Sequence, residues 1–332
     1  MRRSPAEPIS LGPNQIPRFY KGGSRIAAFR GLPPAGDDAP EDWVASSTPV
    51  HGEDEVGLTR LGDGTRLLDR FARDPEAFFE PEHRERFGDD SVLLLKLLDA
   101  GERLPVHVHP DDAFATSELD VSHGKTEGWV ILDAAPGAVV HLGFSRNLDE
   151  DELGALVAGQ EPERILSQMN RLSVAAGDSI FVPAGLPHAI GEGILLLELQ
   201  EPSDLSLLLE WRGLMSETEA FLGLSPEVAL QAVTRSRLLN RDVDRLRERR
   251  GRSLFPPEAD GFFRADLIEG SDPLEPSFSV LVVYEGTGAL RSEFIEVPVE
   301  RGATVLVPFA VGETELTGSC RAIRCRPPSS AA

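Results

Sequence analysis

Two histidines separated by one residue, His107 and His109, are the feature that most constrains this chain. They follow the apolar run Val92–Leu98, which predicts a core strand, so the pair is expected on an extended segment. Side chains alternate along a strand with period two, and both imidazoles therefore project to one face. Neutral imidazole is the commonest protein ligand for zinc and similar metals. From the spacing alone, the two histidines are about as well explained as half of a metal site as by two ordinary core residues.

A second pattern further along the chain favours the metal site. Gly177 is followed after five residues by Pro183-x-Gly185-x-x-His188, and Gly101 precedes the histidine pair by five residues in the same way. Glycine and proline at such positions form turns, which would bring a third imidazole onto a facing strand. The two patterns match the two motifs of the cupin family. They predict that all three histidines hold one metal ion.

Glu127 lies between these motifs, at the start of a predicted strand, and would complete a shell of three histidines and one carboxylate. Such a shell satisfies a divalent cation and leaves room for water or substrate. On its own Glu127 reads equally well as a charge at a strand edge. The remaining histidines are interpreted as hydrogen-bonded core residues: His51, His83, His123 and His141.

The short strands expected from the spacing of apolar residues predict a mainly β protein of the sandwich or barrel type. The match to the cupin motifs implies a bicupin, built from two such units. After the first core strand, short strands are expected at Trp129–Asp133, Ala138–Gly143, Arg171–Ala175, Ser179–Val182 and Gly193–Glu198. A helical patch is expected over roughly 64–86. A helix is expected to start at Ser225, and a charged helix is expected to follow it through Arg250. The predicted division is a flexible arm (1–15), a metal-binding cupin domain (16–214) with a helical insertion (about 147–170), a helical segment (215–255), a second cupin-like domain (256–326) and a tail (327–332).

The net charge of the chain limits the classes of partner that it is expected to bind. With 55 acidic and 33 basic residues the formal net charge is −22, which argues against nucleic acid and anionic membranes as partners. Two cysteines close to the C-terminus do not make a disulfide framework. No apolar run of signal-peptide or membrane-span length is present, so a cytoplasmic location is expected.

Four segments in order carry a resemblance to one family. They read Leu-Leu-Lys96-Leu-Leu-Asp-Ala, Val-His-Val-His109-Pro-Asp-Asp, Gly-Lys125-Thr-Glu127 and Val-Pro-Ala-Gly-x-Pro-His188-Ala-Ile-Gly. This order resembles class I mannose-6-phosphate isomerase over most of residues 16–320. That family is a zinc-dependent bicupin that interconverts an aldose phosphate and a ketose phosphate through an enediol.

The resemblance implies roles for individual residues. It implies zinc at His107, His109, Glu127 and His188, although a His/Glu shell also accepts manganese, iron or cobalt. It places Lys96, Lys125 and Glu198 in the pocket, and Lys125 and Glu198 are the candidates for charge stabilisation and proton transfer. Lys21, Arg25 and Lys96 are the candidates for holding the substrate. The expected ligand is a sugar or sugar phosphate, bound by a monomer or homodimer.

Two positions depart from the family pattern. The family usually has glutamine where this chain has His107, and it has an arginine where this chain has Leu208. Leucine offers neither charge nor a hydrogen-bond donor, so Arg212 is the candidate replacement. These departures leave two alternatives to a mannose-6-phosphate isomerase open: an isomerase of a different sugar, with or without a phosphate, and a sugar-binding or regulatory cupin without catalysis. The shell of three histidines and one glutamate leaves a third, an oxygenase that uses iron or manganese.

The C-terminal strands repeat part of the second motif. Gly302 is followed after five residues by Pro308, but Ala310 replaces the glycine and Glu313 stands where the histidine would be. This half is predicted to be a cupin repeat without metal ligands that covers the catalytic half.

Overall fold

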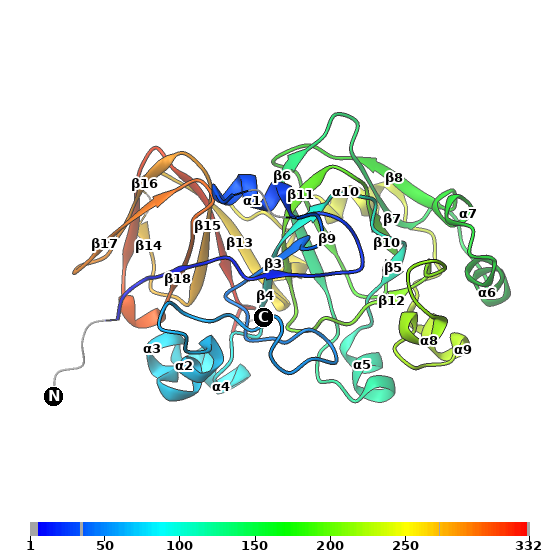
Figure 1. Ribbon diagram of the computed structural model, residues 1–332, viewed down its shortest axis with the longest axis horizontal. Helices are drawn as coiled ribbons and strands as arrows, with labels where there is room; N and C mark the ends of the chain where they lie inside the picture. Colours follow the sequence, from blue (N-terminus) through cyan, green and yellow to red (C-terminus); the bar gives the residue numbers. More distant parts are fainter. Residues whose placement is uncertain (1–5, 34–35, 272, 331–332) are drawn as a thin grey trace.

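The computed structural model describes residues 6–33, 36–271 and 273–330, and in this part of the chain β-strands dominate. The strands form four sheets, two from the middle of the chain and two mainly from its C-terminal part. Figure 1 shows these as two bodies side by side, with the C-terminal strands in orange and red. The predicted mainly β class is confirmed, and the arrangement is consistent with two cupin units.

The larger body contains a six-stranded and a five-stranded sheet. The six-stranded sheet has the order β2 (Gln15–Ile16), β3 (Glu41–Val44), β4 (Leu94–Ala100), β11 (Ile194–Gln200), β6 (Glu127–Ala134) and β9 (Ser179–Val182). The five-stranded sheet has the order β12 (Leu207–Leu208), β5 (His107–Val108), β10 (His188–Ile190), β7 (Val139–Phe144) and β8 (Met169–Ser173). Every residue of the two central strands β4 and β11 is buried, which explains why both read as apolar runs.

The C-terminal body repeats the two-sheet plan. Its five-stranded sheet has the order β1 (Ile9–Leu11), β18 (Thr304–Val307), β15 (Ser279–Glu285), β20 (Arg321–Arg326) and β13 (Arg264–Glu269). Its four-stranded sheet has the order β14 (Pro273–Leu274), β19 (Thr314–Gly318), β16 (Thr287–Arg291) and β17 (Glu296–Glu300).

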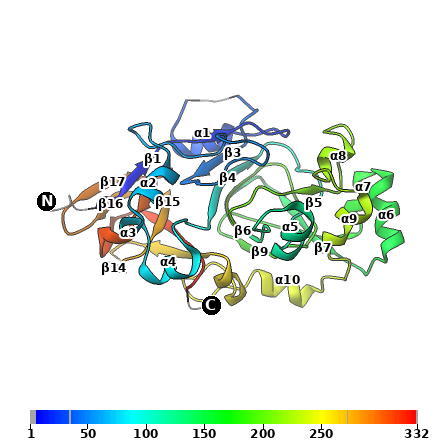
Figure 2. The same ribbon diagram turned by 90° about the horizontal axis from the view of Figure 1, so that it is seen from below.

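Short helices connect and cover the sheets. They are α1 (Ser24–Arg30), α2 (Leu67–Arg73), α3 (Pro75–Phe78), α4 (Pro81–Phe87), α5 (Asp112–Leu119), α6 (Glu150–Gly159), α7 (Pro162–Leu166), α8 (Glu217–Ala220), α9 (Pro226–Ala229) and α10 (Asn240–Leu246). Single 3₁₀ turns occur at Leu230–Ala232, Pro257–Gly261 and Phe309–Val311. Figure 2 shows α6 to α9 at the end of the molecule away from the C-terminal strands.

Three sequence-based expectations need correction. The described part of the arm at 1–15 is not loose, because β1 pairs with β18 and buries Leu11. The patch at 64–86 is three helices, since Pro75 and Pro81 each begin a new one. Ser225 caps α9 as expected, but α9 ends at Ala229. The charged helix expected through Arg250 is α10, which ends at Leu246.

Candidate metal centre and pocket

The three histidines come together where the two sheets of the larger body face each other. His107 on β5 and His188 on β10 are direct cross-strand partners, and His109 lies one residue beyond the end of β5. Glu127 is the first residue of β6, in the other sheet. Gly185 helps to fix this arrangement: its φ of +82° suits glycine, and its N–H donates to the carbonyl oxygen of His109 at 2.7 Å.

Each imidazole is held by its Nδ1 atom. Each Nδ1 lies 2.8 Å from a backbone carbonyl oxygen: His107 with Pro105, His109 with Leu205 and His188 with Leu186. A carbonyl accepts a hydrogen bond, so Nδ1 carries the proton and Nε2 keeps its lone pair. The three histidines each offer a ligand atom within 4.8 Å of the others. All three rings are therefore oriented as metal ligands are.

The Glu127 carboxylate fits as a fourth ligand. Its Oε2 lies 3.1 Å from His109 Nε2, and its Oε1 lies 3.2 Å from His188 Nε2. Tetrahedral zinc with bonds of about 2.0–2.1 Å would place neighbouring ligand atoms roughly 3.3 Å apart. His188 Nε2 is also buried without a hydrogen-bond partner, a costly state that a bound cation would relieve. These residues fit a divalent metal.

The protonation of the histidines suits the same role. Burial, followed by the neighbouring His188, holds the pKa of His107 well below its usual value. Burial, followed by the Lys125 ammonium, lowers the pKa of His109 to about 3. Both rings are consequently neutral at physiological pH, the form that binds metals.

Lys125 connects the ligands to the pocket beside them. Its Nζ atom lies 3.1 Å from His109 Nε2, 3.2 Å from Glu127 Oε2 and 3.5 Å from Glu198 Oε1. Burial alone would lower the pKa of Lys125, but the Glu127 and Glu198 carboxylates outweigh it and raise the pKa above its usual value. Lys125 is therefore a fixed positive charge next to the candidate ligands.

The pocket continues over the strands β4 and β11. Lys96 and Glu198 are cross-strand partners there, with Lys96 Nζ 3.9 Å from Glu198 Oε1 and 3.1 Å from Asp204 Oδ1. Burial, and after it the Glu127 carboxylate, raises the pKa of Glu198 to about 7. A carboxyl group with a pKa near neutrality can both accept and release a proton at physiological pH.

The structure brings some predicted site residues into this pocket and not others. Lys96, Lys125, Glu127, Glu198 and His107 line it, as do Arg18 and Asp204. Lys21 instead points to solvent with 56% of its side chain exposed, and Arg25 pairs with Asp133 and Asp99. The exposed Arg212 bonds to the carbonyl oxygen of Gly159. The structure does not bring these three residues into the pocket: Lys21 and Arg25 follow the segment that enters it, and Arg212 lies past the end of β12.

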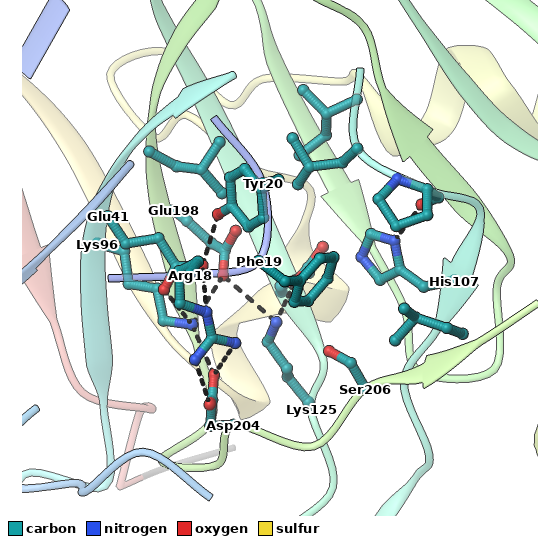
Figure 3. Close-up of a pocket in the computed structure, with 16 residues that line it drawn as sticks. Arg18, Phe19, Tyr20, Glu41, Lys96, His107, Lys125, Glu198, Asp204 and Ser206 are labelled. Carbon is teal, nitrogen blue, oxygen red and sulfur yellow. Dashed lines mark hydrogen bonds and ion pairs between the residues drawn. The ribbon is translucent and has the colours of Figure 1, made fainter. Parts of the chain in front are cut away.

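Sequence reasoning missed four polar residues of the pocket. Arg18, Tyr20 and Glu41 come from the N-terminal segment, and Asp204 lies between β11 and β12 (Figure 3). Arg18 Nη1 lies 3.0 Å from Asp204 Oδ2, and the Tyr20 hydroxyl donates to Glu41 Oε1 at 2.6 Å. No motif marks the first three residues. The strand β3 reads Glu-Asp-Trp-Val, and nothing in that sequence shows that its two carboxylates are buried.

Among the other histidines, the core interpretation holds for His83, which is buried with Nε2 2.7 Å from the carbonyl oxygen of Asp90. His51 is exposed, while His123 and His141 are half-buried, so these three are not core residues. The partner of Leu208 across β12 and β5 is His107, so both departures from the family pattern lie side by side.

The fold and the cluster of three histidines beside Glu127 define a protein of the cupin class with a candidate metal site. No protein-family model matches the sequence. The chain is 34% identical to mannose-6-phosphate isomerase of Streptococcus mutans over 205 residues, which are 60% of this chain and 59% of that protein. It is 30% identical to mannose-6-phosphate isomerase ManA of Bacillus subtilis over 259 residues, 73% of this chain and 78% of that protein.

Solved structures agree with these relatives. The crystal structure of mannose 6-phosphate isomerase from Bacillus subtilis superimposes with a TM-score of 0.78 and 25% identity, covering 97% of this chain and all of that one. A mannose 6-phosphate isomerase bound with zinc and yttrium has the same fold, with a TM-score of 0.75, 16% identity and coverage of 98% of this chain and all of that one. The chain belongs to the mannose-6-phosphate isomerase family.

Proposed function

We propose that this protein is a metal-dependent aldose–ketose isomerase that interconverts mannose 6-phosphate and fructose 6-phosphate. The observation that carries the proposal is the adjacency of three histidines and Glu127, a buried lysine and a carboxyl group with a pKa near 7. The names of the relatives supply the substrate.

We propose zinc as the metal, held by His107, His109, Glu127 and His188. Such an ion would supply Lewis-acid stabilisation of the negative charge that develops on a sugar oxygen during the reaction. Nitrogen and carboxylate donors also accept manganese, iron and cobalt, so the ligand set supports a divalent metal more directly than zinc itself. The solved zinc-containing relative favours zinc.

Glu198 and Lys125 have complementary parts in the proton transfer. The reaction removes the proton from C2 of the aldose and returns a proton to C1, and Glu198 is the base that accepts and delivers it. Lys125, only 3.5 Å from Glu198, remains positively charged and stabilises the oxyanion of the enediolate. Lys96 on the neighbouring strand positions Glu198 and contributes to sugar binding. Arg18 also lines the pocket and is its third cation beside Lys96 and Lys125.

The cellular location, oligomeric state and partners of the protein are part of the same proposal. No helix in the described ranges has the length and hydropathy that crossing a bilayer requires. Both cysteines, Cys320 and Cys325, are free and buried. We place the enzyme in the cytoplasm, as a monomer or homodimer that does not bind nucleic acid or membranes.

The test is isomerisation by protein stripped of metal and then reloaded with zinc, manganese or cobalt. We expect conversion of mannose 6-phosphate only after reloading. Reloaded protein that binds the sugar in a calorimeter but never converts it would instead indicate a sugar-binding protein. Leu208→Arg would then be the variant to examine for gain of activity.

A further inference from the structure

Every cation that lines the pocket among the described residues is already paired with carboxylates (Figure 3). Arg18 and Lys96 share Asp204, at 3.0 and 3.1 Å. Lys125 lies 3.2 Å from Glu127 and 3.5 Å from Glu198.

A further carboxylate strengthens the first pair. Glu41 lies 3.3 Å from Arg18 Nε and 3.5 Å from Lys96 Nζ. Its oxygens also accept hydrogen bonds from the Tyr20 hydroxyl at 2.6 Å and the Trp43 indole at 2.7 Å. The Glu41 carboxylate is thus fixed in place and cannot move aside freely. The pocket holds four of them: Glu41, Glu127, Glu198 and Asp204.

The rest of the wall offers a phosphate no donor with a charge. It consists largely of apolar side chains: Phe19, Leu98, Leu104, Pro105, Ile190 and Leu208. Lys21, Arg25 and Arg212 lie outside the pocket and cannot supply the charge. A phosphate dianion loses a large hydration energy when it is buried, and several charged donors are needed to offset that loss. Here those donors would first have to leave Asp204 and Glu41, which exposes buried carboxylates without partners.

Sugar hydroxyls do not meet this obstacle. A neutral hydroxyl can donate to one carboxylate oxygen and accept from a neighbouring ammonium without separating the ion pair. Alternating carboxylates and cations along the wall suit a row of hydroxyl groups.

We infer that the pocket recognises its hexose through the hydroxyl groups, and that unphosphorylated mannose is isomerised to fructose about as well as the phosphate ester is. This rests on the proposed function and extends it to a second substrate class, the free aldoses. Atoms balance within the sugar: the proton leaves C2 and a proton returns to C1, while the hydroxyl proton on O2 moves to O1. No oxidant or further reactant is required.

The test compares kcat/KM for mannose and mannose 6-phosphate with the full-length, metal-loaded protein. We expect the two values to agree within about tenfold, because phosphate adds little binding energy. A preference for the ester of more than about tenfold overturns the inference and leaves the proposed function intact. If neither sugar is converted, the proposed function fails. The dissociation constants of the two sugars, measured by calorimetry, then test the inference, and a preference for the ester of more than about tenfold overturns it.

A substitution at Asp204 tests whether pairing with carboxylates is what keeps the pocket cations from binding a phosphate. Asp204→Asn releases Arg18 and Lys96 from their shared partner, so we expect the ratio of kcat/KM for ester over free sugar to rise about tenfold. Asp133→Asn removes the same charge from a pair with Arg25 outside the pocket and should leave the ratio unchanged. Glu41→Gln serves as the second variant if Asp204→Asn does not fold. An unchanged ratio in a folded variant overturns the argument from pairing.

Discussion

At the scale of single residues, His107 and Leu208 show how a change beside a metal ligand alters a pocket. They are cross-strand partners, and Leu208 is only 4% exposed. An arginine at 208 would bring a charge and several donors against the first imidazole, whereas leucine closes this wall with apolar surface. In the proposed function, the cations left to contact the sugar include Arg18 and Lys96, which line the same pocket.

The metal assignment predicts the effect of removing one imidazole. His188→Ala deletes a ligand whose Nε2 has no other hydrogen-bond partner, so we expect metal affinity to fall by roughly 100-fold or more. Metal content after dialysis against a weak chelator is the measurement. His141→Ala, on the neighbouring strand β7 and only half-buried, is the matched control and should retain metal. Equal metal content in both variants would contradict the ligand assignment.

Lys96 predicts a loss of stability. Its side chain is 2% exposed, lies within 4 Å of three carboxylates and sits 4.5 Å from the centre of the Trp43 ring. Lys96→Met leaves these buried carboxylates without this partner, so we expect the free energy of unfolding to fall by about 3–5 kcal/mol in urea titrations. Lys21→Met, on the exposed surface, should change it by less than about 0.5 kcal/mol. Equal stability of the two variants would contradict the reading of a charged, paired Lys96.

At the scale of elements, a strand could be predicted from the sequence when its signals are local, and was missed when it depends on pairing with a distant part of the chain. The strands that carry His107, Glu127 and His188 were predictable because apolar runs, turn glycines and ligand spacing are local signals. The strand β1 was missed, since its three residues are fixed only by pairing with β18 almost 300 positions away. Arg18 and Arg212 were misjudged for a similar reason, because tertiary packing alone decides which arginine enters the pocket.

The segment that follows β11 predicts a pH dependence of stability. Burial raises the pKa of Glu201 to about 7, above its unfolded value of about 4.3. The folded state therefore favours the protonated form, so this stabilisation is complete below pH 4.3 and is lost as pH rises through about 7.

Glu201→Gln removes this titration and keeps an oxygen for the Thr126 N–H. We expect the variant to lose roughly 1–3 kcal/mol less of its unfolding free energy than wild type between pH 5 and 8. The measurement is urea unfolding at several pH values. Glu192→Gln, at an exposed position, should keep the wild-type dependence. Parallel curves for wild type and Glu201→Gln would refute this assignment.

At the scale of the whole molecule, the two bodies share one hydrophobic core. Leu97 and Leu197 from β4 and β11 belong to the same buried cluster as Val280 and Ile323 from the C-terminal sheet. Phe79 and Phe278 add a ring contact across the same boundary, with centroids 4.9 Å apart. The C-terminal body therefore covers the back of the sheet whose strands carry Lys96 and Glu198, the side chains proposed to act on the sugar.

A shared core predicts joint unfolding. We expect the metal-free full chain to show one calorimetric transition whose calorimetric and van't Hoff enthalpies agree. A chain that ends at residue 255 should aggregate, because the removed strands leave the apolar face of β4 and β11 uncovered. Two resolved transitions, or a truncated chain that unfolds cooperatively, would show that the bodies are independent.

The most direct test of the central claim is proton exchange at C2 of mannose 6-phosphate in deuterated water, followed by NMR. For the zinc-loaded protein we predict loss of the C2 proton signal together with appearance of fructose 6-phosphate. We predict neither change for metal-stripped protein or for the zinc-loaded Glu198→Gln variant. Undiminished exchange in the stripped protein, or no exchange in the loaded one, would contradict the assignment of this pocket as a metal-dependent isomerase site.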